Sequence, residues 1–328
     1  MTTILGLDIG GANLKAATAD KRAASVPFAL WKHPEQLPAA LAELVARFPD
    51  AGELAVTMTG ELCDCFRTKR EGVRHIVQAV EEAWAGREIA YWSTEGMFVP
   101  AAEAREHPIR VAAANWHAQA TFVARFAPTG FAMMIDTGST TTDLIPIIDG
   151  IPSTFGKTDA SRLRNLELLY LGVRRTPVCA VVPGGCAEFF ATVQDIHVLR
   201  GNMPEEPENL DTADGRPMTK EFSWERIARM IGGDRETVTA EDVGQFLKRA
   251  NSAMESAFIE SFLWLEDSFP LKITNLVISG SGEWFPANFL RDWRPKIPQI
   301  RLSQKLSPAI SEAACAYSVA VLRSERPR

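Results

Sequence analysis

The sequence predicts an α/β protein of two domains that share one architecture, on three observations. The segments Gly6–Asn13 and Ile135–Asp143 each follow a short apolar run, and each joins an aspartate to glycine and small hydroxyl or amide residues. Each segment also opens a new series of apolar runs and amphipathic stretches, which is typical of alternating strands and helices. Finally, 328 residues are enough for two hydrophobic cores. We therefore expect a first domain over 1–127 and a second over 128–328.

The first domain is expected to begin with a meander of strands. Short apolar runs separated by turn residues predict strands at 3–9, 14–19, 25–31, 53–58 and 88–92. Apolar residues at helical spacing predict helices at 37–48, 72–85 and 110–126. In the second of these helices, Val73, Ile76, Val77 and Val80 fall on one side, which is the side expected to face the sheet.

The second domain repeats this pattern and adds to it. Strands are expected at 131–136 and 140–148, followed by an Asp149-Gly150 turn and a short third strand. Further elements are expected as helices at 222–231 and 240–266 and strands at 273–279 and 297–302. The segment 155–165 reads as a polar, basic connection, and the acidic, proline-containing segment 205–220 as an exposed insertion. Ser307 as N-cap and Pro308 at the first position start a closing helix at 307–322, which we expect to pack on the first domain.

Composition and charge narrow the class of protein. Hydrophobic residues make up 46% and charged residues 23% of the chain, as in an ordinary globular protein. The net charge of −6 argues against a nucleic-acid partner. No apolar stretch reaches membrane-spanning length and the first ten residues lack a basic start, so we expect a cytoplasmic protein with no membrane partner. The five scattered cysteines predict no disulfide framework. Whether the protein forms a homo-oligomer stays open.

The two aspartate loops predict a site for phosphate groups and a divalent cation. Asp8 and Asp136 would hold Mg²⁺, directly or through water. Backbone N–H groups approach phosphate closely where side chains are small, and hydroxyl or amide groups add hydrogen bonds. The residues expected to bind phosphate are Gly10, Gly11, Asn13, Gly138, Ser139 and Thr140, with Lys15 as a further candidate on the strand face of Asn13. Plain hairpin turns are the alternative, and the duplication favours the phosphate site.

Four further segments resemble one protein family. They are 57–66, 69–73, 114–118 and 172–178, with the sequences TMTGELCDCF, KREGV, ANWHA and GVRRTPV. They resemble hydantoinase/oxoprolinase-like proteins of the tetrahydromethanopterin-linked one-carbon pathway, whose archaeal members are methanofuran-biosynthesis enzymes. The paired loops are also similar to those of the larger actin/hexokinase/heat-shock-70 ATPase superfamily. That resemblance implies two ribonuclease-H-like domains around an interdomain cleft, where Gly280, Ser281 and Gly282 line the site of a nucleotide or diphosphate.

The family resemblance also implies a reaction. The archaeal members join an aminomethylfuran-methanol diphosphate to the phenol of γ-glutamyltyramine, forming an aryl ether and releasing diphosphate. The partners expected here are that small-molecule diphosphate and a phenolic amine, which is γ-glutamyltyramine or a tyrosine-derived phenol. An ATP-dependent kinase or a hydantoinase/oxoprolinase-like amidohydrolase needs the same loops, so binding of ATP or another nucleotide stays open. A non-enzymatic, actin-like nucleotide-gated module is a third hypothesis.

A run of cations is expected to stabilise the diphosphate leaving group. The segment 157–175 carries Lys157, Arg162, Arg164, Arg174 and Arg175 in a chain that is acidic as a whole. Negative charge grows on the departing diphosphate, so cations placed there stabilise the transition state more than the ground state. Lys157, Arg174 and Arg175 are assigned to the site on this basis, and a solvated basic loop is the alternative.

The phenol must lose a proton as it attacks, which calls for a base. Glu61 and His117 are assigned as acid/base residues, and Asp64 is a further candidate. For His117, a buried structural histidine is the alternative. Cys63 and Cys65 lack the second ligand pair that a structural zinc site uses, so burial is expected for them instead. A furan or phenol ring could stack on Trp31, Trp84, Trp92 or Trp116, although core packing is the commoner role of tryptophan.

Overall fold

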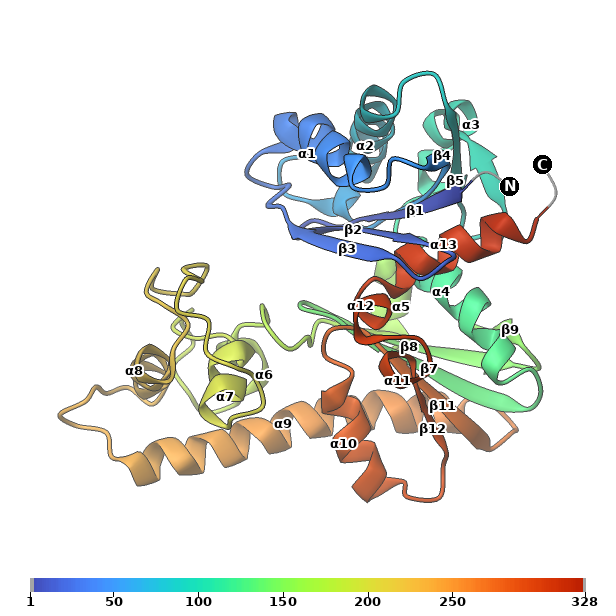
Figure 1. Ribbon diagram of the computed structural model, residues 1–328. Helices are drawn as coiled ribbons and strands as arrows, with labels where there is room; N and C mark the ends of the chain where they lie inside the picture. The colour runs from blue at the N-terminus through green and yellow to red at the C-terminus, as the bar shows by residue number, and fades with distance from the viewer. Residues whose placement is uncertain (1–2, 327–328) are drawn as a thin grey trace.

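The computed structural model describes residues 3–326, which form two α/β domains stacked one above the other (Figure 1). The first sheet has six strands in the order β3-β2-β1-β4-β5-β6. Its first three strands form an antiparallel meander, and β4 and β5 run parallel to β1. The strands are β1 (Thr3–Ile9), β2 (Asn13–Thr18), β3 (Ala23–Pro27), β4 (Ala51–Met58), β5 (Glu88–Trp92) and β6 (Phe98–Pro100).

The second sheet repeats this topology. Its order is β10-β8-β7-β11-β12, with β9 also paired to β8. β7 and β8 form an antiparallel hairpin, and β11 and β12 run parallel to β7. The strands are β7 (Phe131–Thr137), β8 (Thr142–Ile148), β9 (Ile151–Pro152), β10 (Leu168–Leu169), β11 (Ile273–Ser279) and β12 (Gln299–Arg301). Two sheets with one shared strand order confirm the predicted fold class of two ribonuclease-H-like domains.

Helices cover both faces of each sheet. The outer face of the first sheet packs under α1 (Leu37–Ala46) and α2 (Lys69–Ala83), and the outer face of the second packs on α9 (Ala240–Asp267) and α10 (Trp284–Trp293). The remaining helices are α3 (Ala101–Glu106), α4 (Asn115–Val123), α5 (Asp159–Arg164), α6 (Val178–Val181), α7 (Val193–Leu199), α8 (Lys220–Met230), α11 (Leu302–Lys305), α12 (Pro308–Glu312) and α13 (Ala314–Ser324). Although α9 has 28 residues, neither it nor another helix within 3–326 has the apolar length needed to cross a membrane.

The helices α4 and α13 form a central layer between the two sheets. One hydrophobic cluster joins residues of both helices to Ala55 of the first sheet and to Met134 of the second. Strand alternation makes this possible, because Leu5 and Leu7 of β1 pack in the cluster with α1 and α2, whereas Gly6 faces α13. A Cβ atom on Gly6 would lie 1.9 Å from the carbonyl oxygen of Ala316, so only glycine permits this close packing.

A helical insertion lies beside the second domain. The helices α6, α7 and α8 gather at the N-terminal end of α9, around a cluster that contains Ile196, Met230 and Phe246 (Figure 1). The segment 205–220 lies here and is tied by a β-bridge between Glu206 and Met218. The division of the chain at residue 127 stays a prediction.

Two expected helices are broken in the structure. The expected closing helix at 307–322 is split at Ala313 into α12 and α13, and the expected helix at 110–126 begins only at Asn115. In the second case Ala113 has a φ of 46°, so the chain turns before α4 begins. Neither break has a glycine or proline at the point where it occurs. The connection expected at 155–165 contains α5, and β10 follows it.

Candidate active site

The two predicted loops are equivalent hairpins. In the first, the backbone N–H of Gly10 donates to the carbonyl of Asn13 at 3.0 Å; in the second, that of Gly138 donates to Thr141 at 2.9 Å. Asp8 lies one residue before the end of β1 and Asp136 one residue before the end of β7. The duplication seen in the sequence is therefore a structural duplication.

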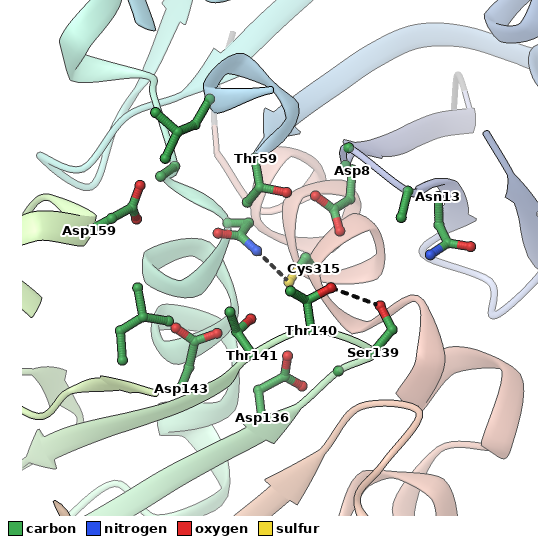
Figure 2. Close-up of a pocket in the computed structure, with 18 of the residues that line it drawn as sticks. Asp8, Asn13, Thr59, Asp136, Ser139, Thr140, Thr141, Asp143, Asp159 and Cys315 are labelled. Carbon is green, nitrogen blue, oxygen red and sulfur yellow. Dashed lines mark hydrogen bonds between the residues drawn. The ribbon is translucent and has the colours of Figure 1, made fainter. Parts of the chain in front are cut away.

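The two hairpins enclose a cavity of about 300 Å³, which we call the inner cavity. Figure 2 shows Asp8 and Asp136 entering it from opposite sides, with Ser139 and Thr140 nearby. The predicted residues that line it are Asp8, Gly10, Gly11, Asn13, Lys15, Asp136, Gly138, Ser139, Thr140 and Arg175. The structure thus brings nearly all of the expected phosphate and metal residues together.

A larger cavity of about 1480 Å³, the outer cavity, continues from the first. Ala12, Asn13, Lys15, Ser139, Arg175 and Glu312 line both cavities and mark their junction. Of the predicted residues, Arg174, Gly280 and Ser281 line the outer cavity only. Gly282 lines neither, because it is packed against Val173 and Thr137, where a Cβ atom would lie 2.6 Å from a valine methyl group.

Asp8 is a buried carboxylate with an unsatisfied oxygen atom. Burial raises its pKa to about 6; Lys15 lowers that pKa, and Asp136 and Asp143 raise it. Its Oδ1 atom is buried and has no hydrogen-bond partner among residues 3–326. In the same range, no group of three His, Cys, Asp or Glu side chains is spaced to hold a metal ion. A divalent cation between Asp8 and Asp136 would therefore take further ligands from water or phosphate oxygens, as Mg²⁺ usually does.

Asp136 is held from behind by a buried polar chain. Its Oδ1 accepts hydrogen bonds from Gln119 at 3.0 Å and from Ser279 at 2.5 Å, and Gln119 in turn accepts one from the thiol of Cys315. Gln119 lies on α4, Ser279 on β11 and Cys315 on α13. These bonds leave the second carboxylate oxygen to the cavity and fix its direction.

A buried ion pair closes one wall of the inner cavity. Arg162 donates to Asp143, which lies opposite Asp136 in the β7–β8 hairpin. The guanidinium also lies over the ring of Trp116, 4.4 Å from its centroid. Burial raises the pKa of Asp143, while Arg162 lowers it and neutralises the charge. Among the aspartates of the two hairpins, Asp8 and Asp136 are thus the ones without an ion-pair partner in the part of the chain described.

The cations at the junction differ in how they are held. Lys15 donates to the backbone carbonyl of Glu312 at 2.8 Å, so it keeps its positive charge for a ligand. Arg175 forms no ion pair or side-chain hydrogen bond within 3–326, and its guanidinium lies over the ring of Trp31, 4.4 Å from the centroid. Arg174, by contrast, is paired with Glu206 through two hydrogen bonds of 2.9 and 2.7 Å. Lys15 and Arg175 are therefore the cations best placed to bind an anion.

Three predicted catalytic residues line neither cavity. Glu61 is buried beneath α2, His117 accepts a hydrogen bond from the indole N–H of Trp92, and Lys157 is exposed. Burial lowers the pKa of His117 to about 4, with Lys157 as the second cause. Their catalytic roles stay predictions, and the alternative of a structural histidine fits the position of His117.

Glu61 instead belongs to an interdomain cluster. Both of its carboxylate oxygens are buried without a hydrogen-bond partner in the part of the chain described, and burial raises its pKa to about 7. The Lys69 ammonium lies 3.6 Å from it and forms an ion pair with Asp159 of the second domain. Asp159 lines the inner cavity, so this cluster connects the buried Glu61 to the site.

Several residues of the site gave no signal in the sequence. Gln119, Asp159, Ser279, Glu312 and Cys315 lie on elements that reach the cavity only through packing of the two domains. Asp143 was within the repeated loop but has Lys15, not an acid, as its equivalent in the first hairpin. A comparison of the two loops therefore does not indicate that Asp143 belongs to the site.

Comparisons with known proteins give the family and the fold. The family model described as hydantoinase/oxoprolinase matches residues 53–289. A Methanocaldococcus jannaschii protein named (4-{4-[2-(gamma-L-glutamylamino)ethyl]phenoxymethyl}furan-2-yl)methanamine synthase is 31% identical over 97% of each chain. A protein of the same name from Methanococcus vannielii is 29% identical over 58% of this chain and 89% of its own. An acetone carboxylase solved without nucleotide shares the fold, with a TM-score of 0.51 and 10% identity over 97% of this chain and 70% of that chain.

Proposed function

This chain belongs to the hydantoinase/oxoprolinase family, and we propose that it is an ether-forming transferase that releases diphosphate. The donor is an aminomethylfuran-methanol diphosphate and the acceptor is a phenol, either γ-glutamyltyramine or a tyrosine-derived compound. The name of the Methanocaldococcus relative describes a product in which a phenoxymethyl group joins a phenol to a furan that carries a methanamine. The similarity spans nearly the whole of both chains, which supports the same bond formation here.

One observation carries the proposal: two equivalent aspartate hairpins face each other across a small cavity that opens into a larger one. The inner cavity offers backbone N–H groups, Ser139 and the cations Lys15 and Arg175 for a diphosphate. The outer cavity leaves room for an organic group. This combination suits an organic diphosphate better than a neutral substrate.

The reaction is proposed to depend on Mg²⁺, which Asp8 and Asp136 would hold. When bound, the cation would supply positive charge beside the diphosphate oxygens. Lys15 and Arg175 bind the same leaving group and stabilise it as its negative charge grows. The buried bonds from Gln119 and Ser279 keep Asp136 in place, so little reorganisation is needed during the reaction.

Exclusion of water from the inner cavity is also required, because water would attack the same furan methylene carbon. The side chains of both domains meet around this cavity, and the Lys69–Asp159 ion pair joins the domains at its edge. The proposed place of the reaction is methanofuran or methylofuran biosynthesis, in which a furan and a phenolic amine become one cofactor.

The test is to incubate the purified protein with Mg²⁺, the aminomethylfuran diphosphate and either γ-glutamyltyramine or a tyrosine analogue. Mass spectrometry should detect the aryl ether, and a coupled assay should detect one diphosphate per ether. A protein that forms no ether but hydrolyses ATP would contradict the proposal and favour an ATP-dependent reaction of the same fold.

A further inference from the structure

Two large apolar side chains lie half exposed at the inner cavity. Leu62 is 50% exposed and comes from the first domain; Tyr170 is 51% exposed and comes from the second. Both line the inner cavity and neither lines the outer one. Exposed apolar side chains from two domains at one cavity indicate a binding surface for a flat apolar group.

Each of these residues is carried by a segment packed tightly on a phosphate hairpin. Next to Leu62, the Cys63 sulfur would lie 2.7 Å from a Cβ atom on Gly11. Beyond Tyr170, a Cβ atom on Gly172 would lie 2.4 Å from the backbone of Ser139. The chain segments that carry the two side chains are therefore packed against the loops proposed to hold the diphosphate.

A carboxylate lies in the same part of the cavity. Asp159 also lines the inner cavity only, and Figure 2 shows it on the side opposite Asn13, with Asp8 and Asp136 between them. Burial and then the charge of Asp159 raise the pKa of Tyr170, which agrees with the nearness of the two side chains. The junction with the outer cavity includes Asn13 and Ser139, and Figure 2 shows both on the side away from Asp159.

We propose that the phenolic acceptor binds between Leu62 and Tyr170 and that Asp159 accepts its proton. This inference rests on the proposed function. The phenolic O–H bond breaks and the proton passes to the Asp159 carboxylate, while the oxygen uses an electron pair to form the bond to the furan methylene carbon. The bond from that carbon to the diphosphate oxygen breaks, and its electron pair leaves with the diphosphate at the junction.

The neighbouring residues Lys69 and Glu61 explain how Asp159 can serve as the base. The Lys69 ammonium forms an ion pair with the Asp159 carboxylate and holds it at the edge of the cavity. After transfer, Asp159 is neutral, and Glu61 at 3.6 Å remains as a partner for Lys69. Glu61 is thus a positioning residue that acts through Lys69, which accounts for a buried carboxylate outside the cavity lining.

The location of the acceptor can be tested with three alanine variants. Leu62→Ala and Tyr170→Ala should each raise the KM for the phenolic acceptor about tenfold and leave the KM for the diphosphate donor within about twofold. Phe189→Ala is the comparison variant for the outer cavity, because Phe189 is 48% exposed and lines that cavity only. All three side chains are partly exposed, so thermal melting should show that each variant folds.

An increase in acceptor KM in Phe189→Ala, with Leu62→Ala and Tyr170→Ala unchanged, would overturn the inference and place the acceptor in the outer cavity. The proposed function would survive that result, because the wild-type protein would still form the ether. A wild-type protein that forms no ether would overturn both.

The role of Asp159 can be tested with acceptors of different acidity. Asp159→Asn should lower kcat about 100-fold with an ordinary phenol and much less with a phenol acidified by ring fluorine atoms, which needs less help to lose its proton. Asp159→Glu should recover part of the activity. An equal loss of activity with both phenols would mean that Asp159 has only a structural role, and would overturn its assignment as the base.

Discussion

Lys15 and Asp143 occupy equivalent positions in the two hairpins, because Lys15 pairs with Asp8 in strand register and Asp143 pairs with Asp136. The first aspartate therefore has a cation beside it, and the second has an anion whose charge Arg162 neutralises. The two halves share a backbone geometry but carry different charges, so they should bind different parts of one ligand.

Both cavity aspartates should be essential to turnover. Asp8→Asn and Asp136→Asn should each lower kcat at least about 100-fold, because each removes a charge that faces the cation without changing the side-chain shape. Asp149→Asn is a matched control: Asp149 lies in an exposed turn with a φ of 48°, which asparagine tolerates. Steady-state kinetics and circular dichroism of the three variants provide the check. Near-normal activity in both cavity variants would exclude the metal–diphosphate role.

Stability should fall as the pH rises through the titration of Asp8. Its folded pKa of about 6 lies above the ordinary 3.8, so the folded state binds the proton more tightly. The contribution of Asp8 to the free energy of unfolding is complete below pH 3.8 and is lost as the pH rises through 6. This contribution is on the order of 3 kcal/mol at most. Asp8→Asn should be at least as stable as wild type at pH 8.

Mg²⁺ should reverse the loss of stability at high pH, because it compensates the buried negative charge of Asp8. We expect Mg²⁺ to raise the melting temperature more at pH 8 than at pH 5, and to have little effect in Asp8→Asn. Calorimetric melting with Mg²⁺ or EDTA measures the difference. A shift of equal size in Asp8→Asn would place the cation elsewhere.

Removal of the Lys69 ammonium should make the buried Glu61 carboxylate destabilise the folded protein. At pH 8, Lys69→Met leaves the Glu61 carboxylate without its cation and should lower the free energy of unfolding by about 3 kcal/mol. At pH 5 the cost should be smaller, because the raised pKa of Glu61 lets it become neutral. The double variant Glu61→Gln/Lys69→Met should recover most of the loss in urea unfolding. Equal costs at both pH values would argue against this coupling.

Trp31 should act on the leaving group through Arg175. Trp31→Ala removes the ring on which the guanidinium lies and should raise the inhibition constant of inorganic diphosphate about fivefold, whereas Trp31→Phe should retain most of the affinity. Arg175→Ala should raise it further. If Trp31→Ala leaves diphosphate inhibition unchanged, the stacking has no role in positioning Arg175.

Gly6→Ala should separate α13 from β1. The added methyl group would meet the Ala316 carbonyl at 1.9 Å, so the central layer must shift, at a cost of about 3 kcal/mol or more. Gly244→Ala on α9 is the matched control, because nothing lies within 4 Å of its Cβ position and alanine favours the helix by about 1 kcal/mol. Urea unfolding should show opposite changes in the two variants.

The sequence was sufficient for the two hairpins and for most of the strands because their information is local; the short strands β6 and β10 were not predicted. Asp8, Gly10 and Gly11 form one continuous loop, and a second copy elsewhere in the chain made the pattern specific. The long helix α9 was also predictable, since Thr239 caps it and its apolar positions recur at helical spacing.

The remaining site residues depend on tertiary packing. Asp159 and Lys69 are 90 positions apart and meet only because the domains close on each other. The difference between Arg174 and Arg175, one neutralised by Glu206 and one stacked on Trp31, is likewise absent from the pattern RR. The sequence shows how many charged residues a segment contains. Burial and ion-pair partners in the folded protein decide which of those charges a ligand can contact.

The position of α13 constrains the order in which the chain can mature on the ribosome. The first sheet is synthesised early, yet the helix that covers its inner face comes from residues 314–324. Until those residues leave the exit tunnel, the inner face of β1 and β4 lacks α13, and α4 is the one helix of the central layer that can cover it. Nascent chains should therefore need a chaperone to cover this face during most of translation. A chain released from a ribosome that stalls before α13 should aggregate.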